Sequence, residues 1–385
     1  MTMQPEAQMR ALIRREMDKG RMPGGIFALW KDGREVFCAQ EGYADLMQRR
    51  PLERDSLFRI YSITKPVTAV AAAILMQEGR LRLDDRVADY LPEYADMTYL
   101  APDGEVRPCR REMTVRHLLS MTSGLVYPDP DPAGMHMQRC FDGFAEANLA
   151  GRGPSTREVA RLIAAQPLAF EPGTDWRYGL SADVLGAVVE VITGMTLRYW
   201  MQERIFMPLG MEDTDFYVPQ HKQHRLTTLY RHMDGRLQAD DTRHLGLTMG
   251  LQPPTFESGG AGLYTTLDDY ARFGNMLACG GGGIISEATL KLFREGMVGS
   301  EFSPALQTDQ YRGYRYGCFM RTFRDAQAAG APGTAGEFGW DGWTGPYVSV
   351  DSVNRTLMLF MMQVGGFHDW ELTLEMRRIA LDALK

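Results

Sequence analysis

The chain has 385 residues, of which 44% are hydrophobic and 24% charged, a composition that excludes a disordered, collagen-like or coiled-coil protein. Its 42 Lys and Arg against 49 Asp and Glu give a net charge of −7, so we expect no sequence-independent binding to nucleic acid or an anionic membrane. The expected partner is a small molecule.

The first residues and the cysteines bear on location. The chain has no run of about 18 apolar residues, and its start lacks the apolar region and cleavage site of a secretory signal, so we expect a cytoplasmic protein. The cysteines form no C-x-x-C pair, which argues against a disulfide framework or a zinc ribbon. We expect buried or incidental thiols at Cys38, Cys109, Cys140, Cys279 and Cys318.

Both ends of the chain predict strands beside a helix. Apolar residues at helical spacing predict a helix over 5–18, which we expect to pack onto a sheet. Two β-type runs around an Asp-Gly pair predict a hairpin over 24–45. Towards the other end, strands are expected at 347–351 and 356–363, followed by a helix over 369–384.

The middle of the chain predicts helices joined by long loops rich in Pro and Gly. Helical periodicity with a glycine near its end occurs over 67–79, 113–124, 156–166 and 181–194. Sheet elements at both ends with helices between them indicate an antiparallel sheet built from both termini. The predicted fold class is therefore α/β (α+β), with a mostly helical insertion.

The tetrad Ser62-Ile63-Thr64-Lys65 is the most informative short motif. It follows a β-type run at 57–61 and opens an apolar helix, so Ser62 and Lys65 lie one turn apart on the same face and can touch. A serine becomes a nucleophile when a neighbouring base takes its proton, and a lysine acts as that base when its pKa is lowered. The alternative is an ordinary N-cap serine and a solvated lysine.

Tyr178 follows a Pro-Gly turn in the segment 171–180 and immediately precedes a predicted helix. S-x-x-K followed by a second and a third motif is the signature of serine β-lactamases and penicillin-binding proteins, and Tyr178 stands at the second-motif position. A phenol there can accept the serine proton or pass it to the leaving group. The alternative is a half-buried core tyrosine.

The segment 339–345 precedes the predicted strand at 347–351, so we expect its backbone to run along a sheet edge beside a cleft. The backbone N–H groups of Ser62 and Trp343 would then point at one carbonyl oxygen and form an oxyanion hole. The alternative is a tryptophan-rich turn without a catalytic role.

Together these motifs resemble a known family. Ser62-x-x-Lys65, Tyr178 and Trp340-Asp341-Gly342 look like the class C β-lactamase fold, and in particular like the family VIII carboxylesterases. The resemblance extends over about residues 20–365, with supporting segments at 118–125, 171–194, 208–216 and 258–277. It implies a serine β-lactamase-like fold: a sheet domain of residues 1–75 and 235–385, a helical domain of residues 76–234, and an active site in the cleft between them.

Two departures from the lactamase pattern bear on the substrate. The third motif of lactamases and peptidases begins with a Lys or His that binds the substrate carboxylate, and here Trp340 stands there. Leu180 replaces the asparagine of the second motif. Both changes favour an apolar, uncharged ester.

The resemblance implies a carboxylesterase that cleaves short- to medium-chain esters through an acyl-enzyme on Ser62, with no cofactor or metal. Lys65 and Tyr178 would share the serine proton, and which of them is the base stays open. The expected substrate-binding residues are Trp340, Asp341, Gly342, Trp343 and Leu180.

Other functions remain as alternatives. The same residues would serve a β-lactamase, a D-peptidase or an acyltransferase, and a catalytically silent binding protein could keep the fold. The G-x-S-x-G elbow of α/β-hydrolases is absent, and the histidines form no H-E-x-x-H or comparable ligand set. The segment Asp129-Pro130-Asp131 lacks the later ligands of a calcium loop and is expected to be a surface turn. We expect a monomer or homodimer without nucleic-acid or membrane partners.

Overall fold

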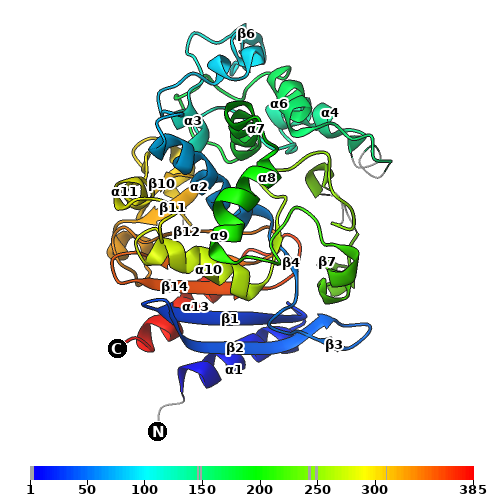
Figure 1. The fold of residues 1–385 in the computed structure, drawn as a ribbon, viewed down its shortest axis with the longest axis vertical. Coiled ribbons are helices and arrows are strands. Elements are labelled where there is room, and N and C mark those ends of the chain that lie inside the picture. Colours follow the sequence, from blue (N-terminus) through cyan, green and yellow to red (C-terminus); the bar gives the residue numbers. More distant parts are fainter. Residues whose placement is uncertain (1–3, 145–146, 148–149, 242–243, 248–249, 309) are drawn as a thin grey trace.

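A computed structural model of the protein describes residues 4–144, 147, 150–241, 244–247, 250–308 and 310–385. An antiparallel sheet of eight strands dominates it, in the order β10-β11-β12-β13-β14-β1-β2-β3 (Figure 1). Its strands are β1 (Gly24–Lys31), β2 (Arg34–Asp45), β3 (Arg50–Pro51), β10 (Tyr314–Gly317), β11 (Met320–Phe323), β12 (Phe338–Asp341), β13 (Tyr347–Asp351) and β14 (Thr356–Met361). Strands from both ends of the chain therefore share one sheet, which confirms the predicted α/β fold class.

The helices of the described residues are α1 (Pro5–Asp18), α2 (Thr64–Gln77), α3 (Val115–Leu119), α4 (Pro132–Phe141), α6 (Thr156–Ala164), α7 (Ser181–Thr193), α8 (Leu197–Met201), α9 (Met207–Leu209), α10 (Leu267–Ala278), α11 (Glu287–Glu295), α12 (Ala326–Ala329) and α13 (Trp370–Asp382). The helix predicted over 113–124 is shorter than expected. It ends at Leu119 because Met121 (φ 57°) and Gly124 (φ 82°) take left-handed conformations that a helix cannot contain. The other predicted helices lie within a few residues of their expected bounds.

The two chain ends meet at the centre of the sheet. Strand β1 pairs with β14 from Ile26 opposite Met361 to Lys31 opposite Thr356. The turn between β1 and β2 has positive φ at both Asp32 (52°) and Gly33 (74°), the conformation that joins twisted strands in a two-residue hairpin. The hairpin predicted from the Asp-Gly pair is thus confirmed.

The sheet buries both of its faces. Side chains alternate along β1. Phe27 and Leu29 pack in an apolar cluster with α1 and α13, whereas Ile26 and Ala28 belong to a larger cluster that includes α2 and α10. Helices α1 and α13 lie at one end of the molecule, and α3, α4, α6 and α7 lie at the opposite end, beyond the larger cluster (Figure 1).

Short strands outside the main sheet complete the fold: β4 (Phe58–Arg59) with β9 (Tyr264–Thr265), β5 (Thr98–Leu100) with β6 (Val106–Pro108), and β7 (Tyr230–Met233) with β8 (Arg236–Ala239). The predicted β-type run at 57–61 is therefore a strand for two residues only. It stops because Tyr61 takes a positive φ of 42° and begins a turn of 3₁₀ helix.

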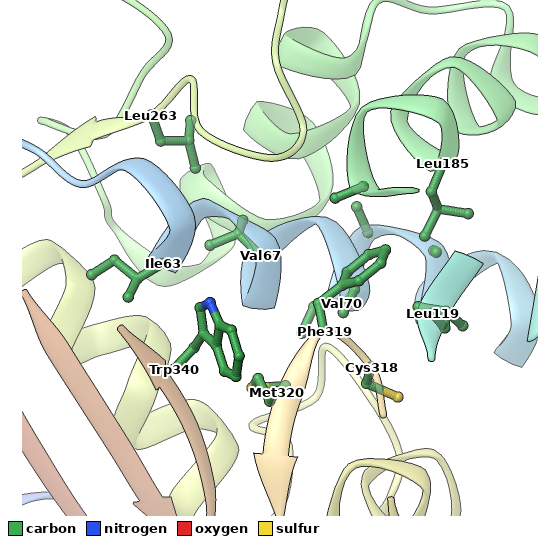
Figure 2. Packing of buried hydrophobic residues seen from close by; sticks show 14 of the residues in the cluster. Ile63, Val67, Val70, Leu119, Leu185, Leu263, Cys318, Phe319, Met320 and Trp340 are labelled. Atoms are coloured by element: carbon green, nitrogen blue, oxygen red, sulfur yellow. The ribbon is translucent and has the colours of Figure 1, made fainter. Parts of the chain in front are cut away.

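The hairpin β10–β11 packs its tip against helices of the middle region. Cys318 and Phe319 form this tip, and the Phe319 backbone N–H donates to the Leu119 carbonyl at 3.0 Å. Figure 2 shows Phe319 beside Val70, with Leu185 and Leu119 nearby, so side chains from four separate segments meet there. This contact joins the sheet to the middle helices.

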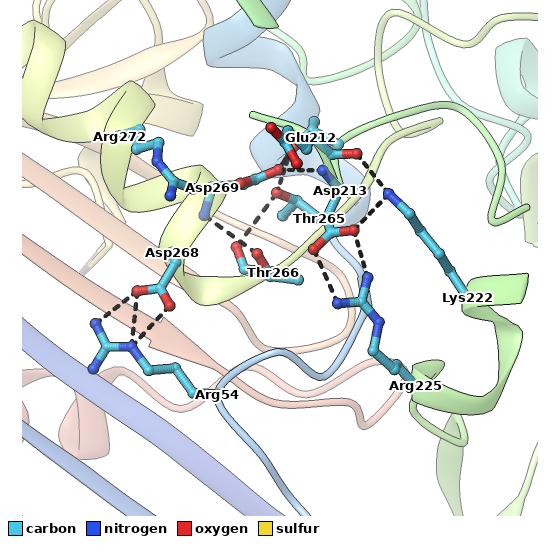
Figure 3. Close-up of polar contacts among 11 residues, drawn as sticks. Arg54, Glu212, Asp213, Lys222, Arg225, Thr265, Thr266, Asp268, Asp269 and Arg272 are labelled. Atoms are coloured by element: carbon cyan, nitrogen blue, oxygen red, sulfur yellow. Dashed lines mark hydrogen bonds and ion pairs between the residues drawn. The ribbon is translucent and has the colours of Figure 1, made fainter. Parts of the chain in front are cut away.

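A polar cluster anchors the start of α10 (Figure 3). Asp269, buried in its first turn, accepts hydrogen bonds from the Asp213 backbone N–H at 2.7 Å and from Thr214 Oγ1 at 3.0 Å. Asp213 in turn pairs with Arg225 and with Lys222. The loop after α9 is thereby fixed to the helix.

Helix α7 is enclosed over most of its length, with every residue from Ser181 to Val189 buried. In the described ranges no single helix is long and apolar enough to cross a membrane. Helix α7 and the segment Leu197–Leu209 pass that test only as a pair, bent by 78°. All five cysteines are free thiols, with Cys140 and Cys318 buried.

Candidate active site

Ser62 lies at a helix start, as the sequence predicts. The 3₁₀ turn Tyr61–Ile63 leads directly into α2, so Ser62 and Lys65 are one turn apart. Lys65 Nζ lies 3.2 Å from Ser62 Oγ. Lys65 is fully buried, whereas Ser62 lines a cleft. The predicted contact between the two side chains is present.

The Lys65 ammonium has three N–H donors, and three oxygens surround it. It donates to Ser62 Oγ, to Tyr127 Oη at 2.9 Å and to the Gly260 carbonyl at 2.7 Å. Its Nζ also lies 4.7 Å from the centre of the Tyr178 ring. Burial lowers the pKa of Lys65 to about 7, although Asp183 acts in the opposite direction. A lysine with this pKa is partly unprotonated at neutral pH and can then accept a proton from Ser62.

Tyr127 is the site residue that sequence reasoning missed. It is partly buried and lines the cleft, where its ring packs against the ring of Tyr178 with the two ring centres 5.6 Å apart. The turn that carries it packs on Gly179, where a Cβ would lie 2.1 Å from the Leu125 carbonyl oxygen. The available signal is its position two residues after the segment 118–125, which the family resemblance includes.

Tyr178 faces Ser62 from the other wall. Trp340 Nε1 donates to Tyr178 Oη at 2.8 Å, and the two rings are 5.2 Å apart. Burial raises the pKa of Tyr178, while hydrogen bonding with Ser62 and Trp340 opposes that rise. The phenol is therefore protonated at rest, and its oxygen has a donor ready to stabilise it when a proton leaves.

Trp340 itself covers a buried cation. The Arg321 guanidinium lies 5.0 Å from the Trp340 ring and pairs with Asp341 at 2.6 Å; the Arg321 side chain is only 4% exposed. The position at which lactamases present a cation thus carries an indole, with an arginine behind it. Trp340 and Asp341 both line the cleft, as predicted.

Two backbone N–H groups, those of Ser62 and Trp343, are the predicted oxyanion hole. Neither Ser62 nor Trp343 donates its backbone N–H to an acceptor in the described part of the chain. Gly342 allows this segment to approach the nucleophile, because a Cβ there would lie 2.5 Å from the Ile60 carbonyl oxygen. Donors without a protein partner beside a serine are suited to bind an oxyanion.

The cleft has a volume of about 430 Å³ and is mostly aromatic. The Trp343 indole stacks on His244, with ring centres 4.3 Å apart and planes inclined by 17°. Burial, together with Arg231, lowers the pKa of His244 to about 4, so this imidazole is neutral at physiological pH. The lining residues are Tyr61, Ser62, Tyr127, Pro128, Asp129, Tyr178, His244, Leu245, Gln310, Tyr311, Trp340, Asp341, Trp343 and His368.

Three expectations need correction. Leu180 does not line the cleft, because its side chain is 1% exposed in the core at the start of α7. Gly342 is buried too and is not among the residues that line the cleft; the absence of a Cβ lets it pack on the Ile60 carbonyl. Strand β12 is not an edge strand, since it pairs with both β11 and β13; β11 covers it only at Phe338 and Gly339, which leaves Trp340 and Asp341 beyond that pairing.

Two further observations concern Asp129 and metal binding. Asp129, expected in a surface turn, is half-exposed and lines the cleft, where it pairs with Arg177 at 3.2 Å. Within the described ranges, no group of three or more His, Cys, Asp or Glu side chains could hold a metal ion. Lys65, Tyr127 and Tyr178 are the ionisable side chains gathered at Ser62.

Known proteins match this chain over most of its length. The family model described as Beta-lactamase matches residues 9–380. Protein Rv1367c of Mycobacterium tuberculosis (strain ATCC 25618 / H37Rv) is 36% identical over 275 residues, which are 70% of this chain and 65% of that protein, so the match covers less than two thirds of the relative. Esterase EstB of Burkholderia gladioli is 32% identical over 281 residues, 69% of this chain and 68% of EstB.

Among solved structures, EstCE1, described as a hydrolase with promiscuous acyltransferase activity, has a TM-score of 0.84 and 28% identity over 98% of both chains. The resemblance expected from the three motifs is confirmed by these matches.

Proposed function

The chain belongs to the beta-lactamase family, and from that premise we propose that it is a serine hydrolase of carboxylic esters that acts through an acyl-enzyme on Ser62. The observation that carries the proposal is the contact between Ser62 Oγ and the buried Lys65 amine, at 3.2 Å on the floor of an open cleft. EstB and EstCE1, an esterase and a hydrolase by their names, support this reaction class.

In the proposed acylation step, Ser62 Oγ attacks the ester carbonyl and its proton passes to the Lys65 amine. The carbonyl oxygen becomes an oxyanion between the backbone N–H groups of Ser62 and Trp343, a stabilisation worth several kcal/mol. The proton then moves to the departing alkoxide, and the alcohol leaves. Tyr127 and Tyr178 both contact this path, and a phenol can pass the proton on.

Deacylation reverses the roles of the groups. Water replaces the alcohol, gives a proton to the same base and attacks the acyl carbonyl, after which Ser62 recovers its proton and the acid leaves. The groups come from both predicted domains: Ser62, Lys65 and Trp343 from residues 1–75 and 235–385, and the two tyrosines from residues 76–234. We propose that these domains form the two walls of the cleft.

The substrate we propose is a small, uncharged ester with a short to medium acyl chain. Trp340 takes the place of the carboxylate-binding cation, and the Arg321 behind it is engaged by Asp341. Aromatic side chains form most of the wall, and such a surface favours apolar groups.

Initial rates on p-nitrophenyl butyrate and on a chromogenic cephalosporin, for the native protein and Ser62→Ala, test the proposal. We expect ester cleavage, its loss in Ser62→Ala, little cephalosporin turnover, and a butyryl adduct on Ser62 in mass spectra of quenched reactions. Ser123→Ala is the control, because Ser123 is a buried serine that contacts Ser181 rather than the cleft. Full ester cleavage by Ser62→Ala contradicts the assignment, and faster cephalosporin turnover favours a β-lactamase.

Acyl transfer is a second candidate function, favoured by the promiscuous acyltransferase activity attributed to EstCE1. An alcohol would then take the place of water in the second step. Adding a primary alcohol at increasing concentration during butyrate turnover distinguishes the two. A transferase forms the new ester at the expense of butyric acid, whereas a strict hydrolase continues to release the acid.

A further inference from the structure

Asp183 is a buried carboxylate that the proposed mechanism does not use. It lies in the first turn of α7, five residues after Tyr178, and is 3% exposed. Its Oδ1 accepts hydrogen bonds from Ser258 Oγ at 2.5 Å and from the Gly260 backbone N–H at 3.1 Å. A carboxylate this deep in the protein is costly unless it is paired and hydrogen-bonded.

The hydrogen bonds of Asp183 fix the turn that faces Lys65. The Gly260 carbonyl, on the other side of the same residue, accepts from Lys65 Nζ at 2.7 Å. The neighbouring Gly259 carbonyl accepts from Thr68 Oγ1 at 2.6 Å, one turn of α2 after Lys65. A Cβ on Gly260 would lie 2.7 Å from Asp183 Oδ2, so the turn packs directly on the carboxylate.

Asp183 and Lys65 also interact electrostatically. The ionisable groups that face Lys65 are Tyr127, Tyr178 and Asp183, and those that face Asp183 are Lys65, Tyr94 and Tyr127. Burial raises the pKa of all three tyrosines, so they are neutral. Burial raises the pKa of Asp183, while Lys65 and the two hydrogen-bond donors act in the opposite direction by favouring its ionised form. Ionised Asp183 is the anion that faces Lys65 among the described residues.

We propose that Asp183 is a positioning residue for Lys65. Its hydrogen bonds with Ser258 and Gly260 hold the Gly260 carbonyl in contact with Lys65 Nζ, and its negative charge helps Lys65 bind a proton. The inference rests on the proposed function, because it assigns Asp183 a role through the candidate base. A residue with a purely structural role would stabilise the turn without affecting the titration of Lys65.

The titration of Lys65 can be followed directly by NMR of protein labelled with [ε-¹³C]lysine, since the chain has six lysines. Lys65→Met identifies the signal. In Asp183→Asn we expect the pKa of Lys65 to fall by about 1, a tenfold weaker affinity for the proton, because an opposite charge has been removed. An unchanged or higher pKa of Lys65 overturns the proposal.

Asp269→Asn is the matched control, because Asp269 is equally buried and also accepts hydrogen bonds from a backbone N–H and a hydroxyl, in the polar cluster of Figure 3. It should leave the titration of Lys65 unchanged. If Asp183→Asn does not fold, Ser258→Ala replaces it: the charge stays and the turn loses one anchor. We then expect kcat to fall by roughly threefold to tenfold with the titration of Lys65 retained, and native kcat contradicts the proposal.

The activity profile gives a second readout. In Asp183→Asn, the limb of the pH dependence of kcat/KM that belongs to Lys65 should move to lower pH. The NMR titration needs no turnover, so it also separates the two proposals. A shifted Lys65 signal in a protein whose esterase activity survives Ser62→Ala would retain the role of Asp183 and reject the proposed reaction.

Discussion

Replacing Trp340 by Phe separates the chemical contribution of its N–H from that of its ring. The indole Nε1–H donates to Tyr178 Oη at 2.8 Å, and the ring covers the Arg321 guanidinium at 5.0 Å. Phenylalanine keeps an aromatic face towards Arg321 but removes the donor to Tyr178, together with part of the ring volume. The substitution therefore tests whether negative charge develops on the Tyr178 oxygen during the reaction.

The expected loss in kcat/KM follows from the strength of the hydrogen bond that Trp340→Phe removes. A hydrogen bond between neutral groups contributes about 0.5–1.5 kcal/mol, and one to a charged group about 1.5–3 kcal/mol. Each 1.36 kcal/mol changes a rate about tenfold. If the phenol carries charge in the transition state, Trp340→Phe should lower kcat/KM about 10- to 100-fold, mainly through kcat.

The assay is steady-state hydrolysis of p-nitrophenyl butyrate, with the melting temperature measured in parallel. Trp176→Phe is the matched control. Trp176 packs on the Tyr316 ring at 5.1 Å, as Trp340 does at 5.2 Å, yet its Nε1 has no hydrogen-bond partner among the described residues. We expect Trp176→Phe to keep kcat/KM within about threefold of the native value. Equal losses in the two variants would refute the reasoning, because ring volume alone would then explain both.

Three more outcomes follow from the site. The value of kcat/KM should rise with pH through about 7 and level off above it. Lys65 is protonated below its pKa of about 7 and cannot then take the serine proton. A value of kcat/KM that does not change from pH 5 to 9 excludes Lys65 as the base. Tyr127→Phe, which removes the oxygen 2.9 Å from Lys65 Nζ, should lower kcat about tenfold with little change in KM, and a loss confined to KM would indicate a binding role instead. Gly179→Ala should lower the melting temperature and the activity together, because its Cβ would overlap the Leu125 carbonyl; a fully stable variant contradicts that packing.

Local features of the sequence predict much of the fold. The Asp32-Gly33 pair predicts its hairpin because both residues tolerate positive φ, and the structure has that turn. The contact between Ser62 and Lys65 is equally local, because residues three apart on a helix share a face. The predicted domain boundaries, the cytoplasmic location and the monomer or homodimer stay predictions.

The partners of the site residues could not be predicted, because the tertiary fold brings them together. Tyr127 is 62 residues from Lys65, and Trp340 is 162 residues from Tyr178. Arg321 lies on β11, a strand without a predicted counterpart, yet it supplies the cation behind Trp340. A motif indicates that a side chain belongs to the site, but the chain topology decides what it contacts.

Leu180 illustrates the difference between a motif position and a place in the cleft. Because lactamases have asparagine there, the sequence suggests that Leu180→Asn would favour amide or lactam substrates. Leu180 is 1% exposed within the core beneath Tyr178, so an asparagine would bury an amide without reaching the substrate. The cost in the free energy of unfolding is roughly 3 kcal/mol, from lost apolar burial and an unpaired polar group.

We therefore expect Leu180→Asn to lower the melting temperature and to leave the ratio of ester to cephalosporin turnover unchanged. Leu180→Met, which keeps an apolar side chain of similar volume, should remain close to the native stability. A stable Leu180→Asn variant with increased cephalosporin turnover would mean that this side chain can turn into the cleft. The exclusion of charged substrates would then depend on Leu180 as well as on Trp340.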